Sequence, residues 1–276
     1  MNKNLYRLLA AHFPEDKTAA CMILPDGRVW TYGDVERASA RIAHLIVALG
    51  LHPGDRVAAQ VEKTPEALVL YLAALRAGMV FLPLNPAYQR HELEYFLLDA
   101  KPGLFVCRPQ SRALAAEIAA LAGVPHLLEL DDAGRGSLID AAAPHADRFD
   151  TVARSADDLA AILYTSGTTG RSKGAVLTHG NLLSNARTLA QLWRFVPADV
   201  LVHALPIFHI HGLFVAINTV LAARASLILQ PRFEPAAVLA ALREATVLMG
   251  VPTFYTRLLQ EPGLDRAACA RMRLFV

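Results

Sequence analysis

The chain has 276 residues, of which 54% are apolar and 19% are charged. This composition predicts a folded protein with a large buried core and excludes a disordered chain. The formal net charge is only +2, and basic and acidic residues are interspersed, so we expect no nucleic-acid partner.

Helix and strand signals alternate through the first half of the chain. A capping box at Thr31 and Asp34 predicts a helix that ends at Gly50. Thr64 and Pro65 predict the start of another helix, which ends at Gly78. Strands are also predicted at residues 56–61, 80–84, 104–107 and 125–130, and helices at 90–100 and 111–123. Repeated strand–helix–strand units predict an α/β fold with mostly parallel sheets flanked by helices.

Residues 131–157 break this alternation, because the segment is rich in Asp, Ala and Gly. We interpret it as a surface connection between a first α/β lobe (residues 1–130) and a second lobe (residues 158–276). In the second lobe, strands are predicted at residues 159–164, 200–205, 225–230, 246–251 and 271–276, and helices at 178–193, 211–223, 234–245 and 253–260. The chain stops at an apolar residue in mid-strand, so we expect a fragment of a longer protein, truncated at the end of its second lobe.

The cysteines and one long uncharged stretch bear on the cellular location of the protein. Cys21, Cys107 and Cys269 are odd in number, far apart and without a CxxC pair, so we expect neither zinc nor a disulfide framework, and a cytoplasmic location. Residues 200–223 lack charged side chains, but they contain three histidines and a proline. We interpret them as a buried strand followed by a buried helix, and we expect no membrane span.

The stretch TSGTTGRSKG, residues 165–174, has the composition of an anion-binding loop. Its glycines allow tight turns that present backbone N–H groups, its hydroxyls are donors, and Lys173 adds a positive charge. It is not a Walker A loop, because Gly174 and not Ser or Thr follows the lysine, and the chain has no Rossmann glycine pattern. The predicted phosphate-binding residues are Thr165, Ser166, Gly167, Thr168, Thr169, Gly170 and Lys173.

The same loop, with its flanking residues LAAILY and AVLTHGNL, resembles the phosphate-loop signature of the adenylate-forming family. That family comprises acyl-CoA synthetases, luciferases and nonribosomal peptide adenylation domains. Three further segments, at residues 70–86, 203–213 and 248–259, are similar to family segments in the expected order, and the closest likeness is to malonyl-CoA synthetases.

The resemblance implies an acetyl-CoA-synthetase-like N-terminal domain and a two-step reaction. A carboxylate attacks the α-phosphate of ATP, and coenzyme A thiolate then displaces AMP. The loop would hold the β- and γ-phosphates, and Thr165 would contact Mg²⁺ bound to ATP. The partners implied are a small carboxylate, ATP and CoA.

Two other segments bear on which carboxylate is used. In the family, the residues that match His209 and His211 border the acyl pocket, and malonyl-CoA synthetases carry an arginine at the position of Arg257. Thr253 and Arg257 are four residues apart and share one helix face. We therefore predict that His209, His211, Thr253 and Arg257 bind a short dicarboxylate, malonate first and methylmalonate second.

The adenine, ribose and catalytic-lysine segments of the family have no counterpart between Met1 and Val276. We therefore assign no catalytic residue beyond the phosphate loop and expect the chain alone to be inactive, with the missing C-terminal part considered as a separate partner chain. Three alternatives stay open: a CoA ligase for another short or aryl acid, a phosphate-binding ATPase or kinase, and a non-catalytic binding module.

Overall fold

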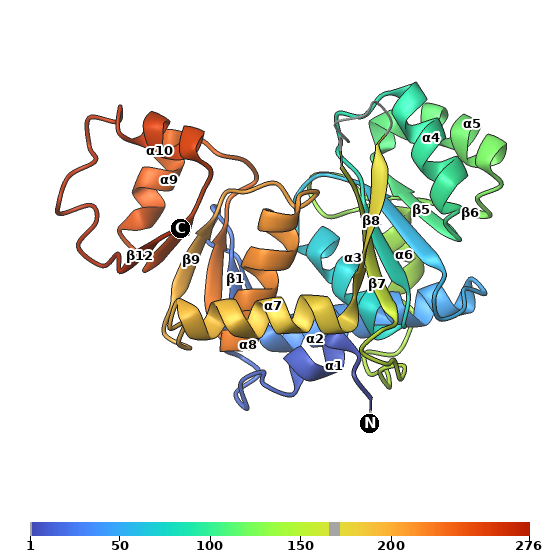
Figure 1. Ribbon diagram of the computed structural model, residues 1–276, viewed down its shortest axis with the longest axis horizontal. Coiled ribbons are helices and arrows are strands. Elements are labelled where there is room, and N and C mark those ends of the chain that lie inside the picture. The colour runs from blue at the N-terminus through green and yellow to red at the C-terminus, as the bar shows by residue number, and fades with distance from the viewer. Residues whose placement is uncertain (1, 166–171) are drawn as a thin grey trace. The chain divides into compact units, whose positions relative to one another are not determined.

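The structure is a computed structural model that describes residues 2–165 and 172–276 (Figure 1). The chain divides into two compact units. Unit 1 comprises Met1–Leu8 and Glu36–Leu183, and unit 2 comprises Leu9–Val35 and Ser184–Val276. Each unit holds one six-stranded, mostly parallel sheet with helices against it, as the alternation of strand and helix signals predicts.

These two units differ from the predicted lobes at residues 9–35 and at residues 131–183. Residues 159–165 belong to unit 1, because Ala161 pairs with Phe81 of the same sheet. Residues 20–23 belong to unit 2, because Met22 pairs with Leu227. Residues 131–157 pack on unit 1 itself: the Arg76 guanidinium donates to the carbonyl of Phe149 at 2.7 Å. Strand pairing between residues distant in sequence decides where the units begin and end. Local composition carries no signal for such pairing.

The sheet of unit 1 has the strand order β6-β5-β3-β4-β7-β8. All neighbours are parallel except β7 and β8. Its strands are β3 (Arg56–Gln60), β4 (Val80–Pro83), β5 (Leu104–Cys107), β6 (His126–Glu129), β7 (Leu159–Thr165) and β8 (Lys173–Thr178). Its helices are α3 (Pro65–Arg76), α4 (Arg90–Ala100), η1 (Pro109–Ser111), α5 (Arg112–Ala122) and α6 (Ser137–Ala142).

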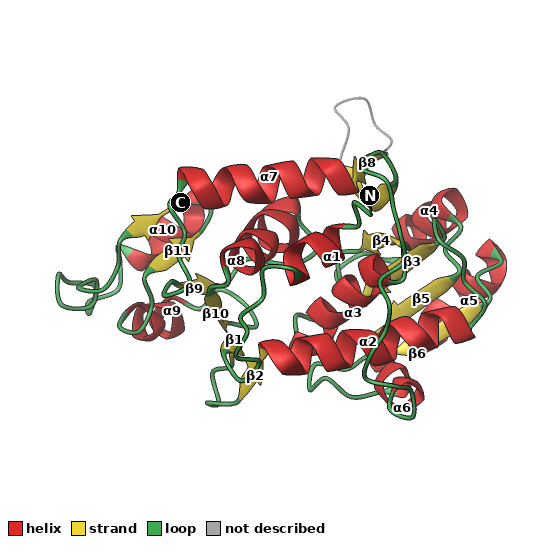
Figure 2. Ribbon diagram, turned by 90° about the horizontal axis from the view of Figure 1, so that it is seen from below, coloured by secondary structure: helices red, strands yellow, loops and turns green. Residues whose placement is uncertain are grey.

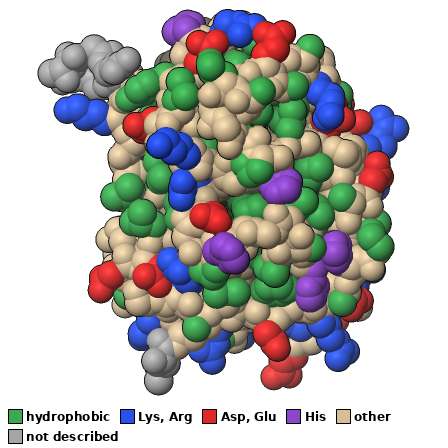
Figure 3. All heavy atoms as spheres, turned by 90° about the vertical axis from the view of Figure 1, so that its right-hand side faces the viewer, with side chains coloured by type: hydrophobic (Ala, Val, Ile, Leu, Met, Phe, Trp, Pro, Cys, Tyr) green, Lys and Arg blue, Asp and Glu red, His purple; other side chains and the backbone are tan. Residues whose placement is uncertain are grey.

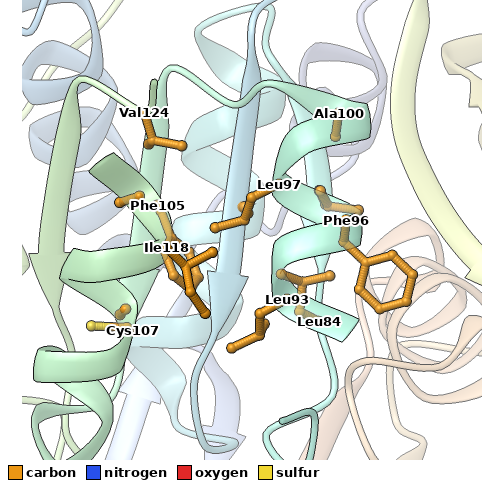
Figure 4. Packing of buried hydrophobic residues seen from close by; sticks show 13 residues of the cluster. Leu84, Leu93, Phe96, Leu97, Ala100, Phe105, Cys107, Ile118 and Val124 are labelled. Atoms are coloured by element: carbon orange, nitrogen blue, oxygen red, sulfur yellow. The ribbon is translucent and has the colours of Figure 1, made fainter. Parts of the chain in front are cut away.

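Helices α4 and α5 lie side by side and cover one face of this sheet (Figures 1 and 2). Phe96 and Leu97 of α4 pack with Phe105 of β5 and Ile118 of α5 in a buried cluster (Figure 4). Successive strand residues point to opposite faces, so Phe81, next to Leu82 of that cluster, contacts Tyr71 of α3 on the other face, with ring centroids 5.4 Å apart. The double coverage explains why these strands are continuously apolar.

The strand β8, which pairs antiparallel with β7, is absent from the sequence-based expectation. The helix expected at residues 178–193 is confirmed as α7, His179–Leu192. The segment KGAVLT was missed because β8 is an edge strand with mostly exposed side chains, and its short, mixed pattern lacks a clear alternation.

The sheet of unit 2 has the strand order β12-β11-β9-β10-β1-β2, with only β2 antiparallel. Its strands are β1 (Ala20–Ile23), β2 (Val29–Thr31), β9 (Val200–His203), β10 (Ser226–Leu229), β11 (Val247–Met249) and β12 (Leu274–Phe275). Its helices are η2 (a π-helix, His211–Ile217), α8 (Asn218–Ala223), α9 (Pro235–Leu242) and α10 (Pro252–Leu258). Three further helices contain residues of both units: α1 (Leu5–Ala10), α2 (Tyr32–Ala48) and α7 (His179–Leu192).

Local start signals read from the sequence are present in the structure. The backbone N–H of Thr31 donates to Asp34, and the N–H of Asp34 donates to the Thr31 hydroxyl, which is the expected capping box of α2. Thr64 accepts from the N–H of Ala67 at the start of α3. Both predicted caps are therefore confirmed. They could be predicted because each involves residues only three positions apart.

Charged side chains of both signs are interspersed over the face shown in Figure 3. None of the helices in the described part of the chain has the length and apolarity needed to cross a membrane. Residues 200–223 form β9, η2 and α8, which confirms the expected buried strand and helix.

A buried histidine in unit 1 provides a pH-dependent test of the fold. His179 is fully buried, and its Nδ1 accepts a hydrogen bond of 3.0 Å from the backbone N–H of Leu5. Burial, followed by the nearby Arg154, lowers the pKa of His179 from 6.5 to about 4. The unfolded chain therefore binds a proton below pH 6.5 that the folded chain takes up only below about pH 4.

We expect the contribution of His179 to stability to be fully present above pH 6.5 and to fall by about 3 kcal/mol as the pH drops to 4. Urea unfolding at pH 7, 6, 5 and 4 measures this slope. His179→Asn keeps an acceptor for Leu5 without the titration, so its slope should be shallower. The matched control is His52→Asn at an exposed position; equal slopes for the His179 variant and the wild type would refute the assignment.

Candidate active-site segments

The candidate phosphate loop joins two paired strands of unit 1. Thr165, at the end of β7, is the register partner of Lys173, at the start of β8, and both residues are exposed. The structure thus brings these two predicted residues together. The predicted residues Ser166, Gly167, Thr168, Thr169 and Gly170 lie outside the described residues.

The pair of residues at the hairpin base suits a phosphate group. A lysine ammonium supplies positive charge and a threonine hydroxyl supplies a hydrogen-bond donor, and their exposure leaves both accessible. No group of three His, Cys, Asp or Glu side chains within residues 2–165 and 172–276 could hold a metal ion.

Gly174 allows the two hairpin strands to pack closely. A Cβ added there would lie 3.1 Å from the Ile162 side chain and 3.4 Å from the Tyr164 ring. The third glycine of the motif thus has a packing role beside the loop. The sequence-based interpretation had assigned it only conformational freedom.

The substrate candidates lie in unit 2, in segments that leave one edge of its sheet. His203 at the end of β9 is the register partner of Leu229 in β10 and of Met249 in β11. The carboxyl ends of these three parallel strands therefore meet at one edge. The segment with His209 and His211 follows β9, and α10 with Thr253 and Arg257 follows β11. Parallel sheets place ligands at this edge.

The surroundings of the two histidines favour their neutral form. Partial desolvation lowers the pKa of both His209 and His211 from the usual 6.5. His209 is exposed and His211 is half-buried at the start of η2. A neutral imidazole donates one hydrogen bond and carries no charge, so His211 could orient a carboxylate without pairing with it ionically.

Sequence reasoning missed how His211 is held. His203 is buried, and its Nε2 donates to the carbonyl of Gly212 at 2.8 Å. Gly212 passes so close to the preceding loop that an added Cβ would lie 2.0 Å from the carbonyl oxygen of Pro206. The sequence contained one signal for this contact: His203 ends a predicted buried strand and lies nine residues before Gly212. These contacts fix the backbone next to His211.

Arg257 is exposed and lies over an aromatic side chain. Its guanidinium carbon is 5.0 Å from the centroid of the Phe233 ring, which stacks on Phe254 with centroids 3.8 Å apart. Thr253 is exposed on the preceding turn of α10. Stacking on an aromatic face holds a guanidinium while its N–H groups stay available for a carboxylate.

Comparisons with known proteins agree with this architecture. Residues 8–276 match the model of the family described as AMP-binding enzyme. The chain belongs to the AMP-binding enzyme family. It is 34% identical over 251 residues to feruloyl-CoA synthase from Amycolatopsis sp, covering 90% of this chain and 48% of that protein. It is 30% identical over 266 residues to malonate–CoA ligase from Arabidopsis thaliana, covering 86% and 44%.

Among solved structures, ATP-bound MatB from Rhodopseudomonas palustris matches all of this chain and 54% of that one, with 55% identity and a TM-score of 0.96. This AMP-binding chain spans about half the length of the curated relatives it matches. The family resemblance and the acetyl-CoA-synthetase-like N-terminal fold expected from the sequence are both confirmed. The roles of the individual phosphate and carboxylate residues stay predictions.

Proposed function

We propose that this chain is the ATP- and carboxylate-binding part of an AMP-forming acyl-CoA ligase that uses malonate, with methylmalonate second. One malonate oxygen attacks the α-phosphate of ATP and pyrophosphate leaves, giving malonyl adenylate. The thiolate of CoA then attacks the acyl carbonyl, and AMP leaves. Thr165 and Lys173 bind the departing phosphates, where negative charge develops. Thr165 would also contact Mg²⁺ bound to ATP, which would supply further positive charge there.

The observation that carries the malonate assignment is Arg257, an exposed guanidinium on a helix that follows the carboxyl end of β11. A second carboxylate on the substrate would be bound there by charge-assisted, bidentate hydrogen bonds. An apolar acid would leave the guanidinium without such a partner. The similarity to a malonate–CoA ligase supports the same substrate, whereas the similarity to feruloyl-CoA synthase supports the runner-up, an aryl acid.

Arg257→Met tests the substrate. The change keeps a long apolar side chain over Phe233 and removes the charge, so malonate binding should weaken about 10- to 100-fold. Acetate binding should change little, because acetate has no second carboxylate. Isothermal titration calorimetry with each acid measures binding.

The matched control is Arg243→Met, an exposed arginine at the end of α9 in the same unit. It should leave malonate binding unchanged. Full malonate preference in the Arg257 variant would refute the substrate assignment. ATP hydrolysis without any carboxylate would favour an ATPase, and stable capture of another protein without ATP or malonate binding would favour a binding module.

A further inference from the structure

Both arms of the phosphate hairpin are hydrogen-bonded to one helix, α4. The Tyr95 hydroxyl of α4 donates to the carbonyl of Ser172, the residue before β8, at 2.7 Å. The Tyr164 hydroxyl of β7 donates to Oδ2 of Asp99 on α4, at 2.5 Å. Tyr95 and Asp99 are four residues apart, so they lie on one face of α4.

The residues that are hydrogen-bonded to α4 are the sequence neighbours of Thr165 and Lys173, the two candidate phosphate-binding residues. Tyr164 precedes Thr165, Ser172 precedes Lys173, and Thr165 pairs with Lys173 in the hairpin register. Each arm is therefore attached to α4 one residue away from the side chain that would meet the nucleotide. A shift of either arm along α4 would move one of these side chains relative to the other.

Ring packing supports the two hydrogen bonds. The Tyr164 ring lies 4.3 Å from Phe96 and 6.1 Å from Tyr95, measured between centroids. Phe96 itself is buried in the core with Leu93 and Leu97 (Figure 4). Helix α4 is thus fixed to the sheet, and it can transmit that rigidity to the hairpin.

Because β8 lies at the edge of the sheet, its position depends strongly on the hydrogen bond to α4. β8 pairs only with β7 among the described strands, and its first four residues are exposed. Edge strands with few buried contacts open locally at low free-energy cost. The Tyr95 hydrogen bond attaches this arm at the residue where the strand begins.

We propose that Tyr95, Asp99 and Tyr164 are positioning residues that set the spacing between Thr165 and Lys173 for binding the phosphates of a nucleotide. This inference rests on the proposed function. The inference goes beyond that function because it assigns part of the affinity for the nucleotide to α4, a helix outside the phosphate loop.

Tyr95→Phe and Tyr164→Phe test the inference, because each removes one hydroxyl and keeps the ring. Hydrogen exchange of peptides that cover β7 and β8, without nucleotide, should be about 3- to 10-fold faster in each single variant and faster still in the double variant. The dissociation constant for ATP should rise about 3- to 10-fold, while that for malonate stays unchanged.

Asp99→Asn keeps an acceptor for the Tyr164 hydroxyl and should resemble the wild type, whereas Asp99→Ala should resemble Tyr164→Phe. A merely structural role would lower the melting temperature and affect both ligands alike. The control is Tyr88→Phe, because the Tyr88 ring packs on Phe96 in the same cluster; it should leave exchange and ATP binding unchanged.

The outcomes separate this inference from the function on which it rests. A wild type that binds ATP, with tyrosine variants that match it in exchange and affinity, would overturn the inference alone. A wild type that binds no ATP would overturn the proposed function, whatever the exchange rates show, and the positioning role with it. Faster exchange with selectively weaker ATP binding supports both.

Discussion

Gly212→Ala should lower the free energy of unfolding of unit 2 by about 4 kcal/mol. The added Cβ would lie 2.0 Å from the carbonyl oxygen of Pro206 and 2.8 Å from its carbon, and these are backbone atoms that cannot rotate away. Relieving the clash would move the start of η2 and break the buried hydrogen bond from His203 to Gly212. The cost therefore combines overpacking with loss of a buried polar contact.

Denaturant unfolding, followed by hydrogen exchange of peptides from unit 2, measures this loss. Gly263→Ala is the matched control, since its Cβ would meet only the end of the Leu239 side chain, at 3.2 Å. That variant should stay within about 1 kcal/mol of the wild type. Equal stability of the two alanine variants would show that the loop before η2 yields easily and that Gly212 does not fix His211.

Arg273→Met should destabilise unit 2 by about 3 to 5 kcal/mol. The side chain of Asp199 is buried, and it accepts from Arg273 Nε at 2.7 Å, from Arg273 Nη2, from the Thr246 hydroxyl at 2.7 Å and from the N–H of Val196 at 2.8 Å. Asp199 precedes β9, Thr246 precedes β11 and Arg273 precedes β12. Removing the arginine leaves a buried carboxylate without its counter-charge at the edge where three strands begin.

The pH dependence of this effect has a defined sign. Burial raises the pKa of Asp199, but the hydrogen bonds from Arg273, Val196 and Thr246 lower it more, so it lies below the usual 3.8. In the wild type its contribution is present above pH 3.8 and is lost as the pH falls through the folded pKa. In Arg273→Met the pKa should rise, so the stability gap between the two proteins should narrow toward acid pH.

Urea unfolding at pH 7 and pH 5 measures that gap. Arg271→Met replaces an exposed arginine two residues away and should have little effect. Asp199→Asn combined with Arg273→Met should recover part of the loss, because the neutral amide needs no counter-charge. Equal effects of the Arg271 and Arg273 variants would contradict a role for the ion pair between Arg273 and the buried Asp199.

Most elements could be predicted from the sequence because their signals are local. The caps at Thr31 and Thr64 involve residues within three positions of each other. The buried strands of both sheets are short apolar runs bounded by turn residues. The loop composition at residues 165–174 indicated an anion, and the order of four family-like segments indicated the AMP-binding family that the comparisons show.

Two of the strands that were missed lack such signals. β2 has only three residues and β8 is largely exposed, so no alternation marked them. β1 is an apolar run as short as β5, which was predicted, and it was overlooked. The two compact units differ from the predicted lobes at residues 9–35 and 131–183, because strand pairing between distant residues decides which unit a segment joins. The attachment of the hairpin to α4 joins Tyr95 with Ser172, and no local pattern connects residues so far apart.

By itself, the sequence determined the α/β class and the mostly parallel sheets, and it supplied the predictions of which residues bind phosphate and carboxylate. Caps, apolar runs and loop chemistry act over a few residues, and sequence records them directly. Only the tertiary structure decided that Thr165 faces Lys173 across a hairpin, that His203 holds Gly212, and that Arg257 lies over Phe233. Those relations come from which strands pair and which helices pack, and they depend on contacts that span much of the chain.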